Sequence, residues 1–469
     1  MTYVIGLDSS TQSCTGVLAD AATGEVVGEA RVSHPTGTQV DPRAWLRAAD
    51  EVLARLARVG TAEAVAVGGQ QHGMVALDDA GEPAHDALLW HDTRSAAAAR
   101  ALIEEMGGAQ ACAAEVGSVL VASFTVTKLR WLRDHEPAAA ARVRSVLLPH
   151  DYVSWHLAGR RAAPWTDRGD ASGTGYYATA RAEWRPDLAQ AALGREVGLP
   201  RVVAPGEVAA TTPEGQVLAA GTGDNMAAAL GTGLCRGDVL LSIGTSGVAS
   251  TVSPHPVADG TGTVTGFAAA DGGFLPMVTT MNAARILDLQ ATWLGTDHAG
   301  LAALALASSP GAGGAALLPY YAGERTPNRP DAVGTWTGLT TDTTRADLAR
   351  AAVEALSCSL ADAVDHLRAH TGESGGRVLL VGGAARSPAV QRVLPAVLGA
   401  SVELPPPAEY VALGAARQAA WALSGAPNPP AWQLPGTQLL EAPATPEVRE
   451  RYATLRDRTS GWDSGWDSD

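Results

Sequence analysis

One pattern of residues occurs twice in this chain and limits the possible folds more than any other feature of the sequence. Near the N-terminus, the apolar residues 3–7 lead into the polar turn of residues 8–13 (DSSTQS), and the apolar residues 15–19 follow. Residues 238–250 (DVLLSIGTSGVAS) repeat this order in mid-chain. Apolar segments joined by a short polar turn predict a β-hairpin. Two such hairpins, each at the head of one half of the chain, indicate an internal duplication with a cleft between the halves.

Strand and helix patterns alternate after the first hairpin and again near the C-terminus. Residues 41–60 have helical spacing with Asp41 as the expected N-cap, and residues 64–69 (AVAVGG) have the composition of a buried strand. A long amphipathic helix is predicted over residues 344–370, and a strand over residues 377–381 follows it. This alternation predicts an α/β fold. Because 469 residues exceed the size of one ordinary core, two domains are expected.

We place the N-terminal domain at residues 1–236, the C-terminal domain at residues 237–425 and a C-terminal extension at residues 426–469. The proline-rich sequence GAPNPPAWQLPG begins after residue 424 and is interpreted as the end of the second core. The final GWDSGWDSD repeats a short polar unit and is expected to be disordered.

Charge and composition exclude several classes of function. The net charge is -15 and the sequence pI is near 5.2, which argues against a nucleic-acid or an anionic-membrane partner. No long apolar run predicts a membrane span, and the scattered cysteines are typical of a reducing cytoplasm. Lys128 does not follow a glycine-rich run, and the chain has no other lysine. A phosphate is therefore expected to be held by local groups, such as backbone N–H groups, a helix N-terminus or a metal ion.

The two hairpin turns carry the first candidate site residues. Backbone N–H groups and hydroxyls of residues 8–13 and 244–247 can surround a phosphate, and the Asp8 carboxylate can hold Mg²⁺ through water. An ordinary polar hairpin turn is the alternative for either turn taken alone.

Two further segments place polar groups beside glycines. In residues 68–73 (GGQQHG), Gln71 and His72 can hydrogen-bond the hydroxyls of a sugar, although a polar loop explains the pattern equally well. In residues 381–388 (VGGAARSP), the glycines let a flat ring or a phosphate approach the backbone, and Ser387 is the expected N-cap of a helix. The spacing is not GxGxxG, which disfavours a dinucleotide fold.

Asp224 has two interpretations. In residues 221–231 (GTGDNMAAALG) it precedes an alanine-rich helix and therefore fits an N-cap. A helix N-terminus also favours the charged carboxylate, which would keep Asp224 a competent proton acceptor near pH 7. The two interpretations do not exclude each other.

Taken in order, these motifs resemble the FGGY family of carbohydrate kinases. The resemblance extends over residues 3–425 and includes GLDSSTQS, GGQQHG, LLWHDTR, LLPHDYVSWHLAG, TDRGDASGT, GTGDN, LSIGTSGV, LLPYYAGERTP and VGGAARS. It implies a two-domain actin-like, ribonuclease-H-like ATPase fold, in which the sugar and ATP meet in a cleft between the domains.

The resemblance also implies which residues handle the sugar and the metal. Asp224 is expected to be the general base that takes the proton of the attacking sugar hydroxyl. Gln71, His72 and Asn225 are expected to contact the sugar. Asp8 is expected to position Mg²⁺.

The nucleotide site is implied in the same way. Thr11 is expected near the phosphates of ATP, and Thr245 in the second turn is expected to hold them. Gly382, Gly383 and Ser387 are expected to border the adenosine.

Within the family, the resemblance is closest to the branch that acts on D-xylulose. The expected reaction transfers the γ-phosphoryl group of ATP to the C5 hydroxyl and gives D-xylulose 5-phosphate. Thr15, Gln71 and Ala384 depart from the usual motifs, so another ketose or polyol, such as ribulose, is an alternative substrate. A non-catalytic sugar-binding protein on the same fold is a second alternative, which the retained Asp8 and Asp224 disfavour. A monomer and a homodimer are both compatible with the sequence.

Overall fold

The computed structural model describes residues 1–462, which form two compact units. The first unit consists of residues 1–234, 253–275 and 408–433, and the second consists of residues 235–252, 276–407 and those from 434 onward. The units interleave along the chain, unlike the contiguous ranges 1–236, 237–425 and 426–469 expected from the sequence. The difference arises because a helix late in the chain packs on the first sheet.

The first unit is built on a mixed β-sheet. Its strands follow the order β13 (Ala210–Thr211), β14 (Val217–Leu218), β5 (Ala62–Gly69), β1 (Tyr3–Ser9), β2 (Ser13–Asp20) and β3 (Val26–Ser33). Strand β1 pairs antiparallel with β2, with Ser9 opposite Cys14 beside the turn, and parallel with β5. The predicted N-terminal hairpin is confirmed.

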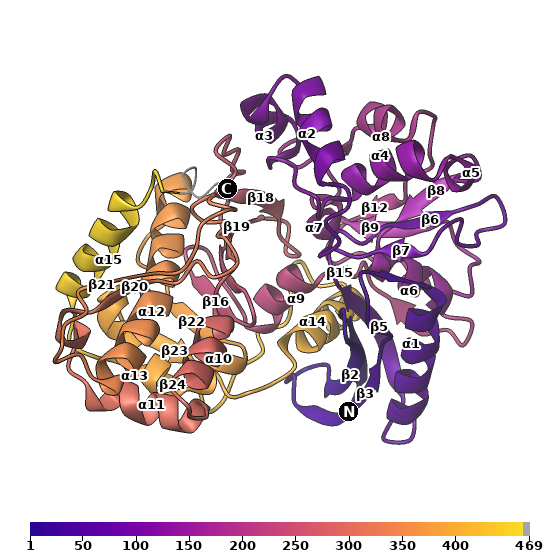
Figure 1. Ribbon diagram of the computed structural model, residues 1–469. Helices are drawn as coiled ribbons and strands as arrows, with labels where there is room; N and C mark the ends of the chain where they lie inside the picture. The colour runs from indigo at the N-terminus through magenta and orange to yellow at the C-terminus, as the bar shows by residue number, and fades with distance from the viewer. Residues whose placement is uncertain (463–469) are drawn as a thin grey trace. The chain divides into compact units, whose positions relative to one another are not determined.

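Helices cover both faces of this sheet. On one face, α1 (Arg43–Leu56) buries Trp45 and Val52 against the sheet. On the other face, α14 (Tyr410–Ser424) packs small alanine side chains against the strands. Figure 1 shows β2, β3 and β5 between these two helices. Helix α1 begins two residues after Asp41, whose Oδ1 accepts a hydrogen bond from the backbone N of Arg43 at 3.0 Å.

Short elements of the first unit carry the polar residues of interest. They are α6 (Pro149–Leu157), β9 (Trp165–Asp167), α7 (Arg168–Ala171), β15 (Thr222–Gly223) and α9 (Asp224–Gly231). Strand β15 pairs with the end of β5, with Gly223 opposite Gly69. Further helices of the unit are α2 (Ala96–Glu105), α3 (Ala109–Val116), α4 (Thr125–His135), α5 (Pro137–Ala140) and α8 (Pro186–Leu193).

The second unit repeats the local topology of the first. Its sheet includes, in order, β19 (Phe274–Thr280), β17 (Gly247–Thr251), β16 (Val239–Ile243), β22 (Val378–Val381), β23 (Val402–Leu404) and β24 (Gln438–Leu440). Strand β16 pairs antiparallel with β17 and parallel with β22, as β1 does with β2 and β5. The second predicted hairpin is confirmed, and the shared topology supports the inferred duplication.

Helices of the second unit extend beyond the predicted end of its core. They are α10 (Ala284–Trp293), α11 (His298–Ala307), α12 (Arg345–Thr371), α13 (Pro388–Leu398) and α15 (Pro446–Arg458). Helix α12 confirms the predicted long helix. The interpretation of the proline-rich sequence as the end of the core is wrong, because the chain after it adds β24 to the sheet beside β23. Of the GWDSGWDSD segment, residues 463–469 lie outside the described residues.

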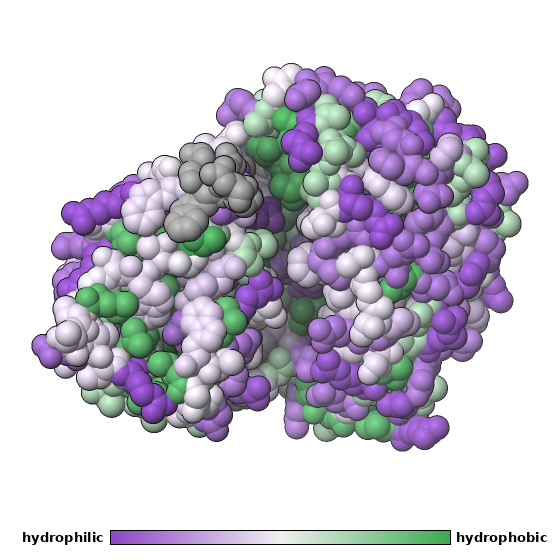
Figure 2. All heavy atoms as spheres, viewed as in Figure 1, coloured by the Kyte–Doolittle hydropathy of each residue, from purple (hydrophilic) through white to green (hydrophobic). Residues whose placement is uncertain are grey.

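The surface, the helices and the cysteines give further information on the described residues. Figure 2 shows that hydrophilic residues predominate on this face of the first unit, with hydrophobic residues in scattered patches. No helix within residues 1–462 is long and apolar enough to cross a membrane. The four cysteines, all in the described part of the chain, form no disulfide.

Candidate active site

Asp224 is the first residue of α9, and Gly223 occupies the N-cap position. The N-cap interpretation is therefore wrong by one residue, because β15 continues through Gly223 beside β5. The Asp224 Oδ1 atom accepts hydrogen bonds from the backbone N of Asn225 at 2.7 Å and from its Nδ2 at 2.9 Å. The carboxylate is thus fixed at a helix N-terminus by its neighbour.

Two of the predicted sugar contacts lie next to Asp224. The Asn225 Nδ2 also donates to Gln71 Oε1 at 2.9 Å, so one amide joins the carboxylate to the glutamine. A Cβ atom at Gly223 would lie 2.7 Å from Gln71 Cγ, so the glycine allows this close approach. Asp224, Asn225 and Gln71 therefore form one cluster, as the resemblance to the FGGY family implied.

His72 is held in an unusual conformation. Its φ angle is 67°, in the left-handed region that non-glycine residues rarely adopt. Its Nδ1 donates to the carbonyl oxygen of Gly173 at 2.7 Å, and its ring centroid lies 4.9 Å from that of Phe124. Strained backbone of this kind is concentrated at functional sites, which favours a binding role for His72.

Asp8 and Thr11, both of the first hairpin turn or its edge, belong to the first unit, which also contains Asp224. Asp8 lies near the end of β1 and is only 7% exposed, and its Oδ1 accepts a hydrogen bond from Ser10 Oγ at 2.5 Å. Thr11 Oγ1 accepts a hydrogen bond from Trp90 Nε1 at 2.9 Å.

Burial, together with a neighbouring negative charge, raises the proton affinity of both carboxylates; the neighbour is Glu409 for Asp8 and Asp8 for Asp224. Burial raises the pKa of Asp224 to about 7, and the negative charge of Asp8 adds to this effect. Burial likewise raises the pKa of Asp8 to about 7. Burial thus opposes the charged form that the helix N-terminus favours, but with a pKa of about 7 the carboxylate is partly ionised near pH 7 and can still accept a proton.

The donor set fits a divalent cation. Two partly desolvated carboxylates that repel each other would be stabilised by a hard cation near Asp8. Within the described residues, no group of three or more His, Cys, Asp or Glu side chains is arranged around a metal position. Mg²⁺ does not need such a cage, because it commonly binds one or two carboxylates together with water and substrate phosphates.

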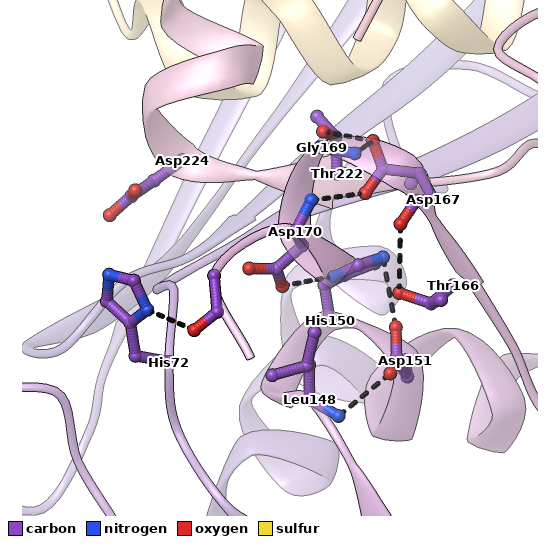
Figure 3. A network of polar contacts seen from close by, with 12 residues as sticks. His72, Leu148, His150, Asp151, Thr166, Asp167, Gly169, Asp170, Thr222 and Asp224 are labelled. Atoms are coloured by element: carbon purple, nitrogen blue, oxygen red, sulfur yellow. Dashed lines mark hydrogen bonds and ion pairs between the residues drawn. The ribbon is translucent and has the colours of Figure 1, made fainter. Parts of the chain in front are cut away.

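A buried charged network that the sequence did not reveal lies beside these residues (Figure 3). His150 Nδ1 lies 2.8 Å from Asp170 Oδ2, and His150 Nε2 lies 3.2 Å from Asp151 Oδ1. Asp167 accepts hydrogen bonds from the backbone N atoms of Gly169 and Asp170, both at 2.8 Å. We call His150, Asp151, Asp167 and Asp170 the His150 network. The motifs PHD and TDRGD contain its members, but the pairing of His150 with Asp170 across 20 residues had no local signal.

The His150 network joins the segments that carry the candidate site. A Cβ atom at Gly69 would lie 2.9 Å from His150 Cβ, and one at Gly221 would lie 2.6 Å from His150 Cδ2. Thr222 Oγ1 donates to Asp167 at 2.8 Å, two residues before Asp224. The network therefore supports both the segment of Gln71 and the segment of Asp224.

The second unit contains a separate pocket of about 550 Å³, a volume within the usual range for small-molecule sites. Thr245, Gly383 and Ser387, predicted to bind the nucleotide, are among its lining residues. Gly382 does not line it, but its φ of 97° requires a glycine there, and a Cβ atom would lie 2.6 Å from Ile243 O. Ser387 is the N-cap of α13, as predicted, although its side chain makes no capping bond. The other lining residues are Ile243, Gly244, Ala284, Leu287, Asp288, His298, Ala299, Ala384, Arg386 and Pro388.

The sequence of these two units matches a known family. Residues 3–231 match the N-terminal domain of the FGGY family of carbohydrate kinases, and residues 239–423 match its C-terminal domain. The chain belongs to the FGGY family of carbohydrate kinases. It is accordingly an ATP-dependent carbohydrate kinase, as the motifs indicated.

Individual members of the FGGY family resemble the chain along most of its length. The xylulose kinase of Streptomyces coelicolor is 46% identical over 90% of this chain and 88% of its own length. The xylulose kinase of Streptomyces rubiginosus is 44% identical over 94% of this chain and 92% of its own length. The crystal structure of xylulose kinase from Bifidobacterium adolescentis superimposes with a TM-score of 0.91 at 44% identity, covering 97% of this chain and 99% of that one. The predicted two-domain actin-like, ribonuclease-H-like fold is thereby confirmed.

Proposed function

We propose that this FGGY kinase phosphorylates D-xylulose at its C5 hydroxyl and releases D-xylulose 5-phosphate and ADP. The observation that carries the choice of sugar is the 46% identity, over 90% of the chain, to a protein named xylulose kinase. The cluster of Asp224, Asn225 and Gln71 supports it, because it offers a base and amide groups to a polyhydroxylated ligand.

Asp224 is the proposed general base. It accepts the proton of the C5 hydroxyl as the oxygen attacks the γ-phosphorus, and the bond to ADP breaks. Asn225 holds the carboxylate in place, and Gln71 and His72 are the proposed hydrogen-bond partners of the other sugar hydroxyls. Phosphoryl transfer depends mainly on such positioning and on charge neutralisation.

Asp8 is the proposed residue for Mg²⁺. When bound, the cation would offset the charge of the phosphates and that of the two carboxylates. Thr11 and Thr245 are proposed to hold the phosphates from their respective turns. Gly383 and Ser387 are proposed to border the adenosine, with Gly382 shaping the turn behind them.

A release assay for ADP with a panel of ketoses and polyols tests the proposal. D-xylulose should give the highest kcat/KM among them. If ribulose or a polyol is turned over in preference to D-xylulose, the proposed substrate is wrong but the chain is still a carbohydrate kinase.

We also propose a cytoplasmic location, which four cysteines without a disulfide suggest. A homodimer stays a prediction, and size-exclusion chromatography would distinguish it from a monomer.

A further inference from the structure

Arg325 is a partly buried cation without a counter-ion among residues 1–462. It belongs to residues 320–327 (YYAGERTP), a motif to which none of the site roles was assigned. In that part of the chain, no hydrogen bond or ion pair engages its guanidinium, and burial alone lowers the pKa of Arg325. An uncompensated charge in such a position costs free energy, which an anionic ligand would recover.

Arg329, in the same segment, has a structural role. Arg329 donates hydrogen bonds to Thr459 Oγ1 at 3.1 Å and to Thr459 O at 2.6 Å, and its guanidinium lies 5.3 Å from the centre of the Tyr320 ring. Arg329 therefore ties the segment to the end of α15. The guanidinium of Arg325 makes no comparable bond to any described residue.

The adjacent Glu324 does not neutralise Arg325. The Glu324 carboxylate accepts hydrogen bonds from the backbone N of Met281 at 2.5 Å, from Asn282 Nδ2 at 3.0 Å and from the backbone N of Arg325 at 2.8 Å. These bonds occupy the carboxylate and fix the segment against the end of β19.

The same end of β19 supports the second hairpin turn. The backbone N of Ala283 donates to Thr245 O at 3.2 Å, and the backbone N of Ala284 donates to Gly244 O at 2.9 Å. Residues 281–284 therefore connect the backbone at Arg325 to the turn proposed to hold the phosphates of ATP.

We infer that the guanidinium of Arg325 binds the phosphate chain of the nucleotide. A guanidinium presents paired N–H donors that match phosphate oxygens, and it stays charged at every physiological pH. The lysine that many nucleotide sites use is absent here, because Lys128 is completely buried and donates to the backbone oxygens of His72 and Ala122. This inference rests on the proposed role of Thr245 and its turn.

Titration calorimetry on the full chain without sugar tests the inference. The probes are a non-hydrolysable ATP analogue with Mg²⁺ and, separately, adenosine. Arg325→Gln should weaken binding of the analogue by at least about tenfold, from the usual strength of a charge-assisted hydrogen bond, and leave adenosine binding within about twofold. Arg325→Lys, which keeps the charge but not the paired donors, should fall between the glutamine variant and the wild type.

Two variants serve as controls. Arg392→Gln removes an equal charge from the exposed face of α13 and should bind both probes like the wild type. Arg329→Gln should lower the melting temperature without changing the ratio of the two affinities. Unchanged analogue binding by Arg325→Gln, or an equal loss for adenosine, would overturn the inference. Because no sugar is present, a failure of D-xylulose as substrate leaves this result unaffected.

Discussion

The imidazole Nδ1 of His150 lies 2.8 Å from Oδ2 of Asp170, and both side chains are completely buried. Asp151 approaches the other ring nitrogen, so one imidazole is held between two carboxylates. Burial lowers the pKa of His150, but the charges of Asp151 and Asp170 raise it to about 9 overall. The ring is therefore a cation at neutral pH and compensates the acidic side chains around it.

Replacing His150 should destabilise the protein strongly. In His150→Gln the buried carboxylates lose their counter-ion, and removal of one partner of a buried pair costs about 3–5 kcal/mol. Chemical denaturation measures the loss. His156 provides a matched control, because its Nε2 lies 2.9 Å from Asp50 Oδ1 at the surface. His156→Gln should cost at most about 1 kcal/mol, as exposed pairs do. Equal losses for the two variants would show that the His150 network contributes no more than a surface pair.

The contribution of His150 should depend on pH. Its folded pKa of about 9 is above the ordinary histidine value of 6.5, so its stabilisation is fully present below about pH 6.5 and is lost as the pH rises through about 9. The difference in melting temperature between the wild type and His150→Gln should therefore narrow between about pH 7 and about pH 10. Burial raises the pKa of Asp151 to about 7 and that of Asp170 to about 6, so these carboxyls titrate at the lower edge of this pH range or below it. A constant difference across this range would contradict the assignment of a charged imidazole.

Asp224→Asn should separate activity from stability. Loss of the base should lower kcat by at least about 10²-fold, while binding of the sugar is retained. The melting temperature should not fall at about pH 8, because the raised pKa of about 7 means that the ionised carboxylate opposes folding there, and the amide removes this charge. Asp187→Asn, at an exposed ion pair with Arg185, is the control and should leave kcat unchanged. An unchanged kcat in Asp224→Asn would refute the assignment of Asp224 as the general base.

The kcat/KM for the sugar should fall at acidic pH, and the pH of this fall should depend on the Mg²⁺ concentration. Asp8 and Asp224 both have pKa values of about 7, so kcat/KM for the sugar should decrease as the pH drops through about 7 and the base becomes protonated. Because a cation near Asp8 favours the ionised forms, higher Mg²⁺ should move this fall to lower pH. Asp8→Asn should abolish this response to metal. A profile that stays flat down to about pH 5 would be incompatible with Asp224 as the base.

The sequence predicted the elements whose signal is local. The hairpins at both turns and the long helix α12 follow from apolar periodicity and turn chemistry within a few residues. The glycines beside Asp224 and Gln71 marked each as a candidate residue, but only the resemblance to the FGGY family implied that the two belong to one site. Helix α9 has its N-cap one residue earlier than the sequence interpretation required, which local pattern alone could not resolve.

Other features depend on packing between distant segments. Nothing near His150 or Asp170 in the sequence indicates that they pair, and only burial turns the expected charged Asp224 into a group with a pKa of about 7. The alanine-rich helix α14 gave no sign that it belongs to the first unit. Its position is set by backbone contacts, since a Cβ atom at Gly6 would lie 1.8 Å from Ala412 O.

Those backbone contacts make Gly414 a critical position. A Cβ atom there would lie 1.8 Å from the carbonyl oxygen of Ala227 in α9, so Gly414→Ala must push α14 and α9 apart. Higher helix propensity favours alanine by about 1 kcal/mol, but overpacking against backbone costs about 1–3 kcal/mol. We expect a lower melting temperature. We also expect a lower kcat, because α9 carries Asp224 at its first residue. Gly461→Ala, where a Cβ atom meets nothing within 4 Å, should change neither quantity. If Gly414→Ala kept wild-type stability and rate, the close contact between α9 and α14 would not be what positions the base.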